Sequence, residues 1–125
     1  MNIAQSLNEI RKSIEVACKQ SNRNPSEVHL LAVSKRQPIA RIEEAYHAGV
    51  RDFGENYVQE LAEKRQKLEH LSEIRWHLIG HLQGNKVKQV LSIAEFFHAL
   101  DSEKLIHEIA RRFKEAGRKQ PWPVF

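Results

Sequence analysis

The chain has 125 residues, 41% of them hydrophobic and 29% charged, which suits one globular domain with a buried core. No apolar run approaches the roughly 20 residues that cross a bilayer, and residues 1–7 lack the basic start and apolar stretch of a secretory signal, so we predict no membrane partner. The net charge of +4 comes from basic residues interspersed with acids, as on solvated helix faces, which argues against a nucleic-acid partner. Cys18 has no second cysteine to pair with, which fits the reducing cytoplasm, where we place the protein.

The first part of the chain predicts a helix, a strand and a second helix. Apolar residues at helical spacing predict a helix over residues 2–20. Residues 28–34 form a compact apolar run rich in β-forming side chains, and we expect a strand that is buried on both faces, as parallel sheets require. Pro38 suits the first turn of a helix that ends at Gly49.

The same alternation continues along the rest of the chain. We expect strands over residues 50–53, 75–79 and 96–100, and the start of another over 123–125. Helices are expected over residues 56–70 and 85–91, and from a cap at Asp101 or Ser102 to Gly117. Alternating strands and helices imply a parallel sheet, and both an open doubly wound sheet and an eight-stranded barrel fit this periodicity. A complete barrel needs about 250 residues, so the chain supplies four units and a fragment.

Polar residues gather where the predicted strands end. The four groups are Ser34-Lys35, Gly54-Glu55-Asn56, Gly80-His81 and Asp101-Ser102. Because the carboxyl ends of parallel strands lie at one edge of the sheet, we expect the four groups to share one face and to form a site.

Lys35 is the member of these groups with the most distinctive chemistry. At the mouth of a buried strand it loses solvation, and Arg36 beside it adds like charge. Both effects disfavour the ammonium form and raise the fraction of nucleophilic amine, which can form a Schiff base with an aldehyde. A strand-end lysine can equally do no more than extend its amine into water.

The other strand-end residues also have plain structural interpretations. Gly54 and Gly80 permit either close approach of a ligand or tight turns, and Asn56 and Asp101 are equally good helix N-caps. Glu55 is expected to pair with Lys35 or Arg36, or to face solvent.

Several common types of site are not predicted. His77 and His81 are four residues apart in a strand and a turn, where helical metal-ligand spacing does not apply, so we predict no metal site. The sequence has no dinucleotide-binding Gly-x-Gly-x-x-Gly, no P-loop and no Gly-x-Ser-x-Gly nucleophile elbow.

Three segments together resemble a known family. They are Leu-Leu-Ala-Val-Ser-Lys at 30–35, Phe-Gly-Glu-Asn-Tyr-Val-Gln-Glu at 53–60 and Trp-His-Leu-Ile-Gly-His-Leu-Gln-Gly-Asn-Lys at 76–86. In this order and spacing they resemble the pyridoxal-phosphate homeostasis protein family, which is similar to the amino-terminal barrel domain of alanine racemase. The resemblance covers the chain from the first helix to its end.

The resemblance implies an α/β fold, namely a partial (β/α)8 barrel with about four to five strand–helix units. It implies that pyridoxal 5'-phosphate is the cofactor and that Lys35 holds it as a Schiff base. The remaining cofactor-binding residues that we expect are Ser34, Asn56, His77 and Gly80. Residues 1–125 would then be one incomplete barrel domain, truncated before the strands that bind the cofactor phosphate.

The function that the resemblance implies is pyridoxal-phosphate binding in intracellular homeostasis of this cofactor, without catalytic turnover. Buffering and delivery would make apo enzymes that use the cofactor its partners. Full-length members are mostly monomeric, whereas the open sheet edges of a half-barrel invite self-association. Two alternatives remain open. One is a racemase or decarboxylase of the same barrel type, which needs an opposing acid or base. The other is a half-barrel that does not bind the cofactor.

Overall fold

The fold is built on a sheet of four parallel strands, seen in a computed structural model that describes residues 1–125. The strands are β1 (Leu31–Val33), β2 (Asp52–Glu55), β3 (Arg75–Leu78) and β4 (Phe96–Phe97). They are hydrogen-bonded in chain order, β1-β2-β3-β4. A doubly wound sheet reverses its strand order, whereas a barrel adds each new strand on the same side. The predicted α/β class is confirmed, and the strand order agrees with a partial barrel.

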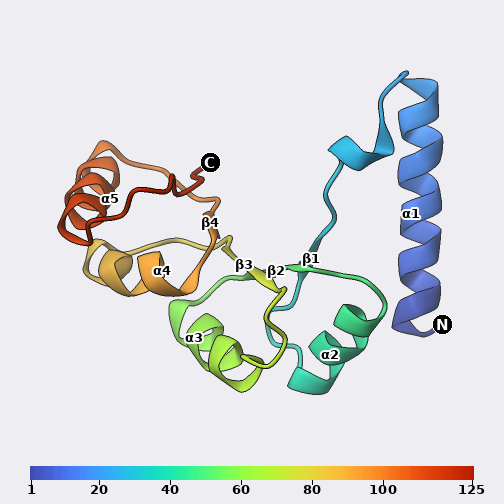
Figure 1. Ribbon diagram of the computed structural model, residues 1–125, viewed down its shortest axis with the longest axis horizontal. Coiled ribbons are helices and arrows are strands. Elements are labelled where there is room, and N and C mark those ends of the chain that lie inside the picture. The colour runs from blue at the N-terminus through green and yellow to red at the C-terminus, as the bar shows by residue number, and fades with distance from the viewer.

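Five helices connect and flank the strands. They are α1 (Ile3–Gln20), α2 (Ile39–His47), α3 (Val58–Lys67), α4 (Val87–Ile93) and α5 (Glu103–Glu115), with short 3-10 turns η1 (Pro25–Glu27) and η2 (Gly84–Lys86). Figure 1 shows the helices following an arc around the strands, with α2 and α3 below the sheet and α4 and α5 beyond β4. No helix has both the length and the apolar character needed to cross a membrane.

Local sequence signals account for several helix ends. The Asn2 side chain accepts a hydrogen bond from the Gln5 N–H, and the Gln5 side chain accepts one from the Asn2 N–H, each at 2.9 Å. The Ser102 hydroxyl caps α5, and Gly49 follows α2 with a φ of 100° that favours glycine. Asn56, in contrast, is not a cap, because α3 begins after Tyr57 and has no side-chain cap.

The core lies between the helices and one face of the sheet, which we call the outer face. Phe53 on β2 is aligned with Trp76 on β3, and both rings are buried there. Helix residues packed into the same core are Ile42, Leu61, Leu68, Val87 and Val90. The opposite, inner face carries Val33, Gly54, His77 and Phe96, which are aligned across the four strands.

Strands β1, β3 and β4 are shorter than the sequence pattern predicted, and β2 lies at Asp52–Glu55 and not at the expected residues 50–53. Of the expected strand over residues 28–34, only residues 31–33 form β1, and Ser34 adds one further hydrogen bond to β2. The first paired residue of β2 is Asp52, so residues 28–30 have no partner strand. Burial on both faces is also wrong: Val33 on the inner face is 52% exposed, because no segment of the described chain covers it. The expected strand over residues 123–125 is a single bridge between Val124 and Phe97.

Candidate functional site at the carboxyl ends of the strands

Lys35 lies in the turn that follows β1. The Ser34 N–H donates to the Gly54 carbonyl at 2.9 Å, so pairing with β2 continues to the residue before the lysine. The Lys35 side chain is exposed and takes part in no hydrogen bond or ion pair of the structure. The described residues therefore do not supply the loss of solvation that the sequence suggested, but they leave the amine free to react.

A buried charged cluster lies directly beneath this turn. The Lys64 ammonium donates to Glu55 Oε1 and Glu60 Oε1, each at 2.7 Å, and to the Ser34 carbonyl at 2.6 Å. The Ser34 hydroxyl donates to Glu55 Oε1 at 2.7 Å. The hydrogen bond from Lys64 lowers the pKa of Glu60, and a further one from the Arg36 N–H acts in the same direction. The four side chains and the turn form one connected network.

Two interpretations made from the sequence are corrected by this cluster. Glu55 contacts neither the side chain of Lys35 nor that of Arg36 and is fully buried against Lys64. Lys64 is buried as well, although its charged neighbours in the sequence suggested a solvated helix face. One signal could have identified it: Lys64 follows Leu61 by three residues and precedes Leu68 by four, which places it on the apolar stripe of α3.

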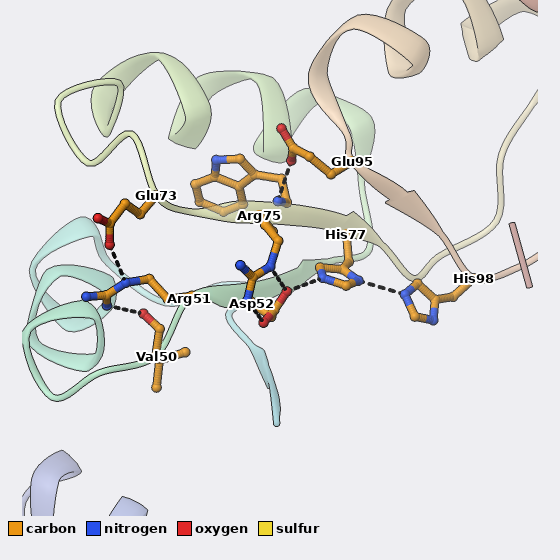
Figure 2. A network of polar contacts seen from close by, with 9 residues as sticks. Val50, Arg51, Asp52, Glu73, Arg75, His77, Glu95 and His98 are labelled. Carbon is orange, nitrogen blue, oxygen red and sulfur yellow. Dashed lines mark hydrogen bonds and ion pairs between the residues drawn. The ribbon is translucent and has the colours of Figure 1, made fainter. Parts of the chain in front are cut away.

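A second polar network lies on the inner face of the sheet (Figure 2). Arg75 donates two hydrogen bonds to the Asp52 carboxylate, at 2.8 and 2.7 Å. His77 donates to Asp52 Oδ1 from Nε2 at 2.9 Å, and its Nδ1 is paired with His98 Nε2 at 2.8 Å. The His77 ring stacks on Phe96, with centroids 4.2 Å apart. Sequence reasoning had placed His77 near the cofactor but had not found Asp52 or His98.

The charges in this network shift the pKa values of its members. Burial raises the pKa of Asp52, but the hydrogen bonds from Arg75 and His77 and the charge of Arg75 outweigh it, so the pKa lies below its usual 3.8. Burial, followed by the neighbouring His77, lowers the pKa of His98 below its usual 6.5. His77 is thus held by Asp52, which lies at the start of β2. No hydrogen bond or ion pair connects His77 with Lys35, which lies just after β1.

The Asp52 network leads to a pH-dependent prediction. Because the pKa of Asp52 is lower in the folded chain, its stabilisation is fully present above the unfolded value near 3.8 and is lost as pH falls through the folded value. We expect Asp52→Asn to lower the free energy of unfolding by about 1–3 kcal/mol at pH 7, and this difference to shrink below pH 4. Urea unfolding across pH 2–7 measures it. Asp101→Asn, in an exposed pair with His81, is the control; a pH-independent difference for Asp52→Asn would contradict the prediction.

Asn56 and Gly80 are brought together at the ends of β2 and β3. A Cβ on Gly80 would lie 2.1 Å from the Asn56 carbonyl oxygen, so only glycine allows this approach. Both residues line a cavity of about 490 Å³, which His81 also borders and Lys35 does not. His81 in turn pairs with Asp101 at 3.2 Å. The strand-end groups therefore meet in neighbouring pairs, whereas the sequence predicted one shared site, and Lys35 itself forms no hydrogen bond or ion pair with any of their side chains.

The two lysines of this region differ in what their amines can do. The Lys64 amine donates to three oxygen acceptors, whereas the Lys35 amine has no hydrogen-bond or ion-pair partner. An unpaired amine can condense with an aldehyde once it is neutral. The Lys35 amine at the end of β1 therefore fits the aldehyde group of pyridoxal phosphate.

Comparison with known proteins gives the following matches. No protein-family model matches the chain. The pyridoxal phosphate homeostasis protein of Haemophilus influenzae is 49% identical over 106 residues, which are 84% of this chain and 45% of the relative. The protein of the same name from Escherichia coli K12 is 42% identical over 102 residues, 80% of this chain and 44% of the relative.

Solved structures agree with these relatives. PipY of Synechococcus elongatus PCC7942, with pyridoxal phosphate bound, superposes with a TM-score of 0.77 at 39% identity, over 94% of this chain and 50% of PipY. A structure described as an unknown protein from Bifidobacterium adolescentis superposes with a TM-score of 0.84 at 29% identity, over 98% of this chain and 59% of that protein. The chain spans about half the length of the curated relatives it matches. The resemblance to pyridoxal phosphate homeostasis proteins is confirmed, and the partial coverage fits their amino-terminal half.

Proposed function

We propose that this chain provides the lysine-bearing half of a pyridoxal-phosphate-binding protein that acts in intracellular homeostasis of the cofactor. The observation that carries the proposal is the free, exposed amine of Lys35 at the carboxyl end of β1, in a chain similar to proteins of that name and to PipY with the cofactor bound. Bound there, the cofactor supplies a reactive aldehyde. The neutral Lys35 amine adds to the aldehyde carbon and water leaves, so that a C=N bond replaces C=O without oxidation or reduction.

The other site residues have distinct roles in the proposal. Ser34 fixes the turn that carries Lys35, through its backbone and its hydroxyl. Asn56 and Gly80 provide the neighbouring wall at the ends of β2 and β3. His77 belongs to the inner face, where it borders the barrel interior. In this proposal residues 1–125 are one domain, the amino-terminal half of an alanine-racemase-type barrel.

We also propose that the site binds without turnover. A racemase or decarboxylase needs an acid or base directed at the reacting carbon, and the inner-face histidine His77 is instead paired with Asp52 and His98. Apo enzymes that use the cofactor are the proposed recipients, in the cytoplasm.

Labelling of the purified chain tests the proposal. With pyridoxal phosphate we expect a Schiff-base absorbance band and, after borohydride reduction, an adduct on Lys35 by peptide mass mapping. Lys35→Ala is expected to lose both, whereas Lys67→Ala, at an exposed lysine of α3, keeps them. Label scattered over surface lysines, unchanged by Lys35→Ala, would favour a half-barrel that does not bind the cofactor. Racemisation of alanine would favour the enzyme alternative.

A further inference from the structure

We propose that the cluster of the buried Glu55 and Lys64 with the half-buried Glu60 is a clamp that positions the backbone on both sides of Lys35. The inference rests on the proposed function for Lys35 itself and assigns positioning roles to three residues that have no part in the chemistry. Since the Lys35 side chain forms no hydrogen bond or ion pair, its direction is set by the backbone that carries it.

The first arm of the clamp holds Ser34. Lys64 Nζ donates to the Ser34 carbonyl at 2.6 Å, and the Ser34 hydroxyl donates to Glu55 Oε1 at 2.7 Å. Ser34 is 4% exposed and Glu55 is fully buried, so water competes little for these hydrogen bonds. Both the backbone and the side chain of the residue before Lys35 are therefore fixed.

The second arm holds Arg36. Its N–H donates to Glu60 Oε1 at 2.6 Å, the same oxygen that accepts from Lys64. Arg36 has a φ of 60°, a left-handed conformation that a residue with a side chain adopts only when its surroundings hold it there. One ammonium group thus connects the residues before and after Lys35.

The cluster is better explained by positioning than by stability. Burying an ion pair costs as much desolvation free energy as its attraction returns, so apolar residues of similar size would stabilise the fold at least as well. The arrangement also leaves Glu55 Oε2 buried without a hydrogen-bond partner. The charged groups hold the Ser34 carbonyl and the Arg36 N–H in a fixed geometry, which apolar side chains could not do.

Two matched variants of α3 test the clamp. Glu60→Ala removes the acceptor for the Arg36 N–H and leaves the Lys64–Glu55 pair in place. Glu63→Ala makes the same change of charge three residues later, where the side chain accepts a hydrogen bond from Gln59 alone. Hydrogen exchange of the Arg36 amide in the free chain is the first measurement, with the amides of β2 as reference. The fraction of borohydride-fixed pyridoxal phosphate found on Lys35 is the second.

We expect the Arg36 amide to exchange about tenfold faster or more in Glu60→Ala, the factor that corresponds to a lost hydrogen bond to a charged group, and to be unchanged in Glu63→Ala. The Lys35 fraction of the label should fall only in Glu60→Ala. Unchanged exchange at Arg36, or equal labelling of Lys35 in both variants, would overturn the clamp. If the unmodified chain labels no lysine selectively, the proposed function fails, and the exchange of the Arg36 amide alone decides whether the clamp exists.

Discussion

Replacing Lys64 by methionine should lower the free energy of unfolding by about 3–5 kcal/mol, the range for removing one partner of a buried ion pair. Methionine fills a similar volume but leaves the buried Glu55 carboxylate without its cation. It also leaves the Ser34 carbonyl without its donor. Urea unfolding at neutral pH measures the change.

Two further variants isolate the cause. Lys67→Met alters an exposed lysine at the end of the same helix and should change the free energy of unfolding by less than about 0.5 kcal/mol. Glu55→Leu combined with Lys64→Met removes both buried charges and should recover most of the lost stability. A double variant as unstable as Lys64→Met alone would mean that lost packing, and not an unpaired charge, causes the effect.

Replacing Gly80 by alanine should be the other strongly destabilising change. The added Cβ would meet the Asn56 carbonyl oxygen at 2.1 Å, and neither backbone group can move without disturbing the end of its strand. We expect a loss at or above the upper end of the about 1–3 kcal/mol that overpacking usually costs. Thermal and urea unfolding give the magnitude, and exchange of the amides near residue 56 shows whether the disturbance is local.

Gly84→Ala is the matched control for this change. It lies four residues further along the chain, at the start of η2, where an added Cβ would meet only Glu108 Cγ at 3.7 Å, an ordinary contact distance. We expect a change within about 0.5 kcal/mol. Equal effects of the two alanines would imply that flexibility of the loop, rather than close approach at Gly80, requires glycine.

Much of the fold could be predicted because it follows from local patterns. The helix over residues 2–20 was expected from apolar spacing and is found at Ile3–Gln20, and the order of strands and helices is the predicted one. Strand lengths could not be predicted, because they depend on where the neighbouring strand begins. β1 starts at Leu31 because that residue is the first to meet a partner in β2.

The site was predicted only in part, for a related reason. The turn of Lys35 and the meeting of Asn56 with Gly80 follow from strand ends sharing one edge of a parallel sheet. The Lys64 cluster and the Asp52–His77–His98 network depend on side chains from different elements meeting in space. Asp52 and Arg75, for example, are 23 residues apart and are joined only by the register of β2 and β3.

The consecutive strand order also bears on how the chain folds. Hydrogen bonds between neighbouring strands, or residues directly beside them, join residues that are 19 (Trp76 and Glu95), 21 (Ser34 and Glu55) and 23 (Asp52 and Arg75) positions apart. Each new strand therefore closes a loop of nearly the same short length, and the entropy lost in closing a loop rises only slowly with its length. Successive strand–helix units can add one after another without the two ends of the chain having to meet first.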